Sequence, residues 1–140
     1  MRRCLGPLLL ALLAVACAAP VASTAAPAAD NAAIARAFAE HRSNVEVTAE
    51  GQVARLLTDE TSGTGTHQRF VLTLRGSTQT LLITNNVSIG KRVPAAVGDA
   101  LVVHGEYVWN DQGGLVHFTH HDPEGSHEGG WIERLGLRYQ

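Results

Sequence analysis

The stretch Val45-Glu46-Val47-Thr48-Ala49-Glu50-Gly51-Gln52-Val53-Ala54-Arg55-Leu56-Leu57 decides the fold. It opens with alternating apolar and polar side chains, which is the period-two pattern of a half-buried strand. Gly51 interrupts the alternation, and a glycine inside a strand often marks a bulge or a bend. The stretch therefore predicts one long first strand, bent or bulged at Gly51. A strand bent in this way can pair with both halves of a small barrel.

Four more strands are expected after the first one. Residues 58–66 hold two glycines and mostly small polar side chains, so we expect a loop there. Leu72 of the second strand and Val103 of the fourth strand should share one core, because both lie on the more apolar face of their strand. The expected strands cover residues 45–57, 68–75, 79–85, 100–108 and 115–120, and residues 131–133 and 137–139 should form a terminal hairpin.

These features predict a mainly β fold, namely a small five-stranded OB-like barrel with a short N-terminal helix and a C-terminal β-hairpin. An open sandwich of the same strands is the alternative. Asp30 is a candidate N-cap for the helix. A chain of 140 residues holds one domain at most beside a targeting segment. The expected division is a signal peptide at 1–17, an Ala/Pro-rich tether with the short helix at 18–43, and the barrel domain at 44–140.

The N-terminus has the pattern of a bacterial secretory signal peptide. Two arginines follow Met1, and residues 5–16 are apolar but too few for a membrane-spanning helix, which needs about 20 residues. Two cleavage sites are compatible with the sequence: a small-x-small site at residues 14–16, or a lipobox in which Cys17 is acylated. Both predict an exported domain, periplasmic or lipid-anchored at Cys17, with no transmembrane span in the mature protein.

Composition excludes several classes of function. The net charge of -2 and the 17% of charged residues do not give a basic nucleic-acid footprint. Few aromatic side chains alternate with the basic ones, so a nucleic-acid partner is disfavoured. The only cysteines are Cys4 and Cys17, so the folded domain can hold neither a disulfide nor a cysteine-based zinc site.

Histidines mark the candidate site. Four of the seven lie within residues 117–127, and imidazole is the commonest metal ligand in proteins. Imidazole and carboxylate donors suit a divalent transition metal such as Zn. A metal site would require at least three of these side chains, or Glu106, to converge within a few Å. The candidate metal ligands are His104, His117, His120, His121 and His127, and together with Glu106 they make the six side chains of which at least three would have to converge.

Strand parity relates two of these candidates. If Val108 pairs with Leu115, Glu106 lies opposite His117, and the side chain of Phe118 should face the core. The same register would place His104 opposite Thr119 and would put His104, Glu106, His117 and His121 on one outer face. Glu106 and His117 are the candidate catalytic residues, because a carboxylate can orient an imidazole as a general base. The pair could equally bind the metal, or form a plain cross-strand charge pair.

Two classes of function remain open, and the sequence does not decide whether the protein is an enzyme. The first is a metal-dependent site that activates water for hydrolysis. The second is a non-enzymatic binding module of the cell envelope for a glycan, a protein or an oligonucleotide. The candidate ligand-binding residues for such a module are His67, Arg69, Trp109 and Trp131.

Several short motifs resemble one bacterial family, DUF3465, a small exported domain of unknown function. The resemblance covers residues 51–140, and Phe118 stands where the family pattern leads us to expect Trp. It implies a coherent fold and no particular chemistry. The motifs are His67-Gln68-Arg69-Phe70, Gly105-Glu106-Tyr107, Trp109-Asn110, Gly113-Gly114, His117, Thr119-His120-His121-Asp122-Pro123, His127, Gly130-Trp131-Ile132 and Tyr139-Gln140.

Overall fold

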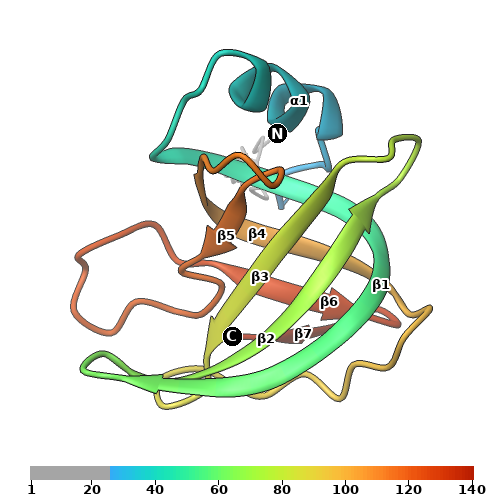
Figure 1. Ribbon diagram of the computed structural model, residues 1–140. Coiled ribbons are helices and arrows are strands. Elements are labelled where there is room, and N and C mark those ends of the chain that lie inside the picture. Colours follow the sequence, from blue (N-terminus) through green and yellow to red (C-terminus); the bar gives the residue numbers. More distant parts are fainter. Residues whose placement is uncertain (1–25) are drawn as a thin grey trace, which may run out of the picture.

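The computed structural model describes residues 26–140, which form a mainly β fold with one short N-terminal helix (Figure 1). The elements are α1 (Asn31–Ala39), β1 (Val45–Ser62), β2 (Gly65–Leu74), β3 (Thr80–Asn86), β4 (Ala100–Val108), β5 (Leu115–His117), β6 (Trp131–Arg134) and β7 (Leu137–Tyr139). Within this described part, no helix is long and apolar enough to cross a membrane. The predicted signal peptide and Cys17 lie outside the described residues.

The seven strands form one mixed sheet in the order β1-β2-β3-β5-β4-β6-β7. An additional antiparallel pairing between β1 and β4 closes the first five of these strands into a ring. The β3–β5 pairing is parallel, and the other pairings are antiparallel. The predicted terminal hairpin is confirmed as β6 and β7, and β6 also pairs with β4 beside β5.

Strand β1 changes partner at Gly51. This residue pairs with Leu74 on β2 and also with Leu101 on β4. A Cβ atom at Gly51 would collide with the carbonyl oxygen of Thr73, so the close approach of the two strands requires glycine here. The predicted use of one strand for both halves of the ring is confirmed. The register shifts of the β1–β2 pairing lie further along, after Val53 and Leu57, and not at Gly51.

Two predicted strand boundaries are wrong. The expected loop at 58–66 is a tight hairpin, because β1 continues to Ser62 and pairs with β2 from Gly65. Its small polar side chains support this pairing; the hydroxyls of Thr61 and Thr66, for example, lie 3.1 Å apart. The fifth strand ends at His117 rather than at residue 120. Phe118 has a φ of 52°, which takes the backbone out of the extended conformation.

The core lies inside the ring and follows the predicted alternation. Leu72 and Val103 are both fully buried in one cluster, as expected. Helix α1 adds Ile34 to this cluster, and Asp30 caps the helix by accepting a hydrogen bond from the backbone N–H of Ala33. Helix α1 therefore packs onto β1.

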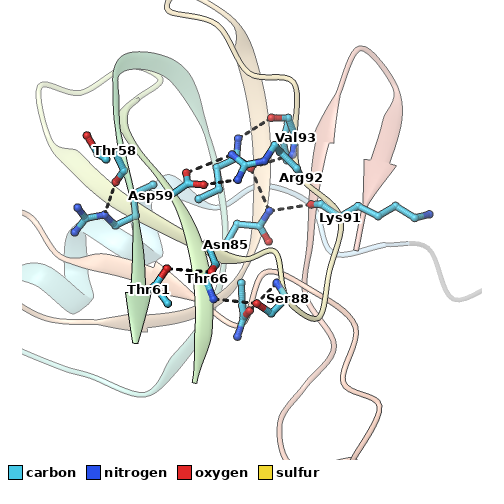
Figure 2. Close-up of polar contacts among 12 residues, drawn as sticks. Thr58, Asp59, Thr61, Thr66, Asn85, Ser88, Lys91, Arg92 and Val93 are labelled. Carbon is cyan, nitrogen blue, oxygen red and sulfur yellow. Dashed lines mark hydrogen bonds and ion pairs between the residues drawn. The ribbon is translucent and has the colours of Figure 1, made fainter. Parts of the chain in front are cut away.

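A buried polar network fills one end of the ring. The side chain of Gln68 both donates to and accepts from the backbone of Val93, at 2.7 and 3.0 Å. Asn85 donates to the Lys91 carbonyl at 2.9 Å, and Thr119 donates to Asn85 at 3.2 Å (Figure 2 shows Asn85, Lys91 and Val93). These bonds satisfy polar groups that would otherwise be costly to bury. They also fix the connection between β3 and β4 and the chain that follows β5.

The close approach at Gly51 makes a testable prediction. Gly51→Ala should lower the free energy of unfolding by about 1–3 kcal/mol, because the new methyl group must push β1 away from Thr73. Gly63→Ala is the matched control, since a Cβ there meets no atom within 4 Å, and it should change stability by less than about 0.5 kcal/mol. Urea unfolding measures both variants. Equal stability of the two would contradict the close approach of β1 to β2.

Candidate functional site

The predicted pairing of β4 with β5 is confirmed. Val108 pairs with Leu115, and Glu106 lies opposite His117. The His117 Nε2–H group donates to Oε1 of Glu106 at 3.1 Å. Both side chains are partly exposed. The two candidate catalytic residues therefore lie side by side on the outer face of the sheet. The hydrogen bond to Glu106 uses Nε2 of His117, so Nδ1 is the ring nitrogen that does not contact Glu106.

His104 lies on the same outer face of β4 but is buried. Its partner on β1 is Thr48 and its partner on β6 is Trp131. The Trp131 ring stacks on the imidazole with centroids 5.6 Å apart. The expectation that Thr119 lies opposite His104 is wrong, because β5 ends before reaching that position and β6 takes its place.

Both nitrogens of His104 have polar neighbours. Nδ1 lies 2.9 Å from Oγ1 of Thr48, and Nε2 lies 3.1 Å from Oε1 of Glu128. Glu46 stands two residues before Thr48 on β1, so its side chain projects from the same face. Glu128 comes from the loop that precedes β6. The imidazole is thus held from one side by a hydroxyl and faces carboxylates on the other.

Glu46, His104 and Glu128 form a candidate metal centre. Each contributes one potential ligand atom, and these atoms lie within 4.8 Å of one another. Within residues 26–140, no other three His, Cys, Asp or Glu side chains form such a group. The six side chains proposed from the sequence therefore do not converge on one point, and only His104 belongs to this group.

The two carboxylates of this group repel each other. Partial burial raises the pKa of Glu46, and the negative charges of Glu128 and Glu106 raise it further. The positive charge of a protonated His104 acts in the opposite direction. Glu46 also lies directly opposite Glu106 in the β1–β4 pairing, and like charges in directly opposed positions destabilise a sheet. A bound cation would relieve this repulsion.

Four of the other candidate histidines line a pocket of about 480 Å³. It lies against the outer face of β2, β3 and β5, beneath the loop that follows β5. Of the candidate ligand-binding residues, His67 lines it. The candidate metal ligands His117, His120 and His127 line it too. The sequence therefore identified four of the pocket residues without relating them to one cavity.

Aromatic stacking fixes the wall of this pocket. Phe118 stacks on His117 at 4.0 Å and on His127 at 4.1 Å between ring centroids, so its ring lies between the two imidazoles. The prediction that Phe118 faces the core is wrong, because its positive φ turns the side chain outward and directs Thr119 into the core instead.

The loop after β5 is closed on itself. The backbone N–H of Gly130 donates to the carbonyl oxygen of His120 at 2.9 Å. Inside the loop, Asp122 accepts hydrogen bonds from the backbone N–H groups of Glu124 and His127. The N–H of His127 is the main reason that the pKa of Asp122 lies below its ordinary value. The turn at Asp122 and Pro123 is thus held by the aspartate side chain.

The remaining candidates lie apart from both groups. The side chain of His121 is exposed beyond the end of β5. Arg69 forms an ion pair with Glu60 at 2.9 Å. Trp109 donates from Nε1 to the Phe38 carbonyl at 3.1 Å, at the C-terminal end of α1. The roles proposed for these residues and for Trp131 stay predictions.

Sequence reasoning missed Glu46 and Glu128. Glu46 is part of the alternation of apolar and polar residues at the start of β1, so the sequence predicts that its side chain points outward. Its approach to His104 depends on the register between β1 and β4, which are far apart along the chain. Glu128 lies in an irregular loop and gives no periodic signal at all.

A comparison with known families identifies the family of the chain. Residues 15–140 match a family described as a protein of unknown function, DUF3465. The chain belongs to this family. The match extends the resemblance noted for residues 51–140 toward the N-terminus. A comparison with curated proteins found no match. Membership in the DUF3465 family brings no established activity, so function has to be argued from the geometry of the two groups.

The buried imidazole of His120 makes stability depend on pH. Burial lowers the pKa of His120 below its ordinary value of 6.5. As the pH falls through 6.5, the unfolded chain takes up a proton that the folded ring resists, so stability should decrease. His120→Asn should flatten the loss of unfolding free energy between about pH 7 and pH 5, measured by urea unfolding.

His121→Asn is the matched control for His120→Asn, because it removes an adjacent but exposed imidazole. It should keep the pH dependence of the wild type. An identical slope for wild type and His120→Asn would show that the folded ring takes up its proton freely.

Proposed function

We propose that this protein is an exported OB-type barrel domain that binds a divalent transition metal such as zinc through Glu46, His104 and Glu128. The observation that carries the proposal is the convergence of these three ligand atoms within 4.8 Å. One imidazole and two carboxylates form a donor set that zinc accepts, with a fourth position for water or a ligand. No cysteine is needed.

The distances around His104 suit a shared ion. Two ligands of a tetrahedral zinc with bonds of about 2.0–2.1 Å lie about 3.3 Å apart, and Nε2 of His104 lies 3.1 Å from Glu128. If Nε2 binds the metal, Nδ1 carries the proton and donates to Thr48. A hydrogen bond of this kind commonly orients a metal-binding histidine and fixes its tautomer.

The fold supports the barrel part of the proposal. The five-strand ring has β1 paired with both β2 and β4, and a parallel β3–β5 contact completes it. A closed ring of five strands with a bent first strand is the arrangement of an OB-type barrel. The basic start of the chain and the apolar residues 5–16 support export, either to the periplasm or to a lipid anchor at Cys17.

A hydrolytic role is the extension of this proposal. Glu106 and His117 form a carboxylate–imidazole pair, and Glu106 lies opposite Glu46 across the β1–β4 pairing. The pair therefore stands beside the proposed metal, where an imidazole oriented by a carboxylate could accept a proton from water. The second candidate function is a non-enzymatic binding module, which the size of the histidine pocket favours.

Zinc titration tests the metal proposal. The purified wild type without a His-tag should bind one zinc ion per chain in a calorimetric titration. Glu46→Gln and Glu128→Gln should each weaken binding at least about tenfold, because each removes a charged ligand. The affinity should also fall below about pH 6, since only neutral imidazole binds metal.

Glu124→Gln is the control for the zinc titration. It neutralises an exposed carboxylate of the same loop that is outside the candidate metal centre, and it should bind zinc like the wild type. If the wild type binds no zinc, or all three variants bind it equally well, the metal proposal fails.

A further inference from the structure

The histidine pocket is a second site, separate from the candidate metal centre. None of Glu46, His104 and Glu128 lines it. Its volume of about 480 Å³ lies within the range of about 300–1,000 Å³ that is usual for small-molecule sites. Strands β2, β3 and β5 form its floor, and the closed loop after β5 forms one wall. Figure 1 shows that this loop and the β1–β2 turn lie on the same side of the ring.

The charges around the pocket disfavour an anionic ligand. Asp122 and Glu124 line it, and none of its described lining residues is Lys or Arg. A phosphate, sulfate or carboxylate ligand would therefore meet negative charge without a permanent cation to bind it. The burial that lowers the pKa of His120 also keeps its ring uncharged at neutral pH.

The imidazoles offer hydrogen-bond acceptors. Nδ1 of His120 and Nδ1 of His127 each lie 2.7 Å from a backbone carbonyl oxygen, which can only accept. Each Nδ1 must therefore carry the proton, which in the buried ring of His120 leaves the Nε2 lone pair as an acceptor. Nε2 of His127 lies 4.0 Å from a carboxylate oxygen of Asp122, so it faces negative charge. In His117, Nε2 lies 3.1 Å from Oε1 of Glu106, which leaves Nδ1 as the nitrogen that can accept when the ring is neutral.

The rest of the lining combines hydroxyl groups with apolar surface. Thr64 and Thr84 supply hydroxyls from the β1–β2 turn and from β3, and Glu124 adds an exposed carboxylate. Phe118 and Ile89 supply carbon surface. A suitable ligand must therefore donate several hydrogen bonds, carry no negative charge and present C–H groups to the apolar part of the wall.

We infer that this pocket binds a neutral carbohydrate, such as one or two sugar units of an envelope glycan, through hydroxyl groups that donate to the imidazole and carboxylate acceptors. Sugar hydroxyls supply the donors, and the C–H groups of the sugar ring suit Phe118 and Ile89. The inference goes beyond metal binding and does not depend on it, because the two groups share no residue.

Chemical-shift titration by NMR tests this inference on the purified protein, with a panel of neutral di- and trisaccharides of glucose, galactose and N-acetylglucosamine as probes. At least one sugar should shift the backbone resonances of His67, Thr84 and Phe118. His67→Ala, which removes an imidazole from the pocket floor, and Glu124→Gln, which replaces a charged acceptor by an uncharged amide, should each weaken that binding by about tenfold. Glu128→Gln, which lies in the same loop but outside the pocket, should bind the sugar like the wild type.

The outcomes separate the two proposals. Sugar binding that survives Glu128→Gln but not Glu124→Gln supports the pocket, whether or not zinc binds. If no neutral sugar shifts these resonances, the inference is overturned. It is equally overturned if glucose 6-phosphate or spermidine shifts them and the neutral sugars do not, because the pocket would then select charge. A well-dispersed spectrum of His67→Ala shows that the variant is folded, and Glu124→Gln provides an independent test because its side chain is exposed.

Discussion

Strand β1 pairs with both β2 and β4 at Gly51, and this double pairing closes the ring. Only a residue without a side chain allows β1 to approach Thr73 on β2 while its earlier half pairs with β4. The earlier half brings Glu46 and Thr48 to His104. The later half leads to the turn at Thr64 on the rim of the histidine pocket. Both candidate sites are therefore consequences of one long strand that closes the ring.

A second constraint acts after β5. The positive φ of Phe118 sends Thr119 into the polar end of the core and leaves the aromatic ring outside between two imidazoles. The chain then forms a loop closed by a hydrogen bond between Gly130 and His120. Two consecutive residues of this loop belong to different sites: His127 lines the histidine pocket, and Glu128 contacts His104 of the candidate metal centre. The candidate metal centre and the histidine pocket are thus neighbours that differ in chemistry. The metal centre has two carboxylates beside one imidazole, whereas several imidazoles line the pocket.

The features of the fold that follow from local periodicity could be predicted from the sequence. The bounds of β4, the terminal hairpin and the opposition of Glu106 and His117 follow from alternation and from short turns. It did not predict the approach of Glu46 to His104, because the register of two strands far apart along the chain is decided by packing of the whole ring. It could not predict the outward turn of Phe118 either, since a positive φ is uncommon for a bulky residue. Three of the four histidines of residues 117–127 line the pocket, whereas the candidate metal centre lies outside that stretch and contains only His104 among the predicted ligands.

We propose that the closed ring builds a cation site from Glu46, His104 and Glu128. The most direct test is an anomalous difference map at the zinc absorption edge, recorded from crystals grown with zinc. This proposal predicts one strong peak within bonding distance of Nε2 of His104 and of carboxylate oxygens of Glu46 and Glu128. A map without a peak there, or with its strongest peak among His117, His120 and His127, would contradict it.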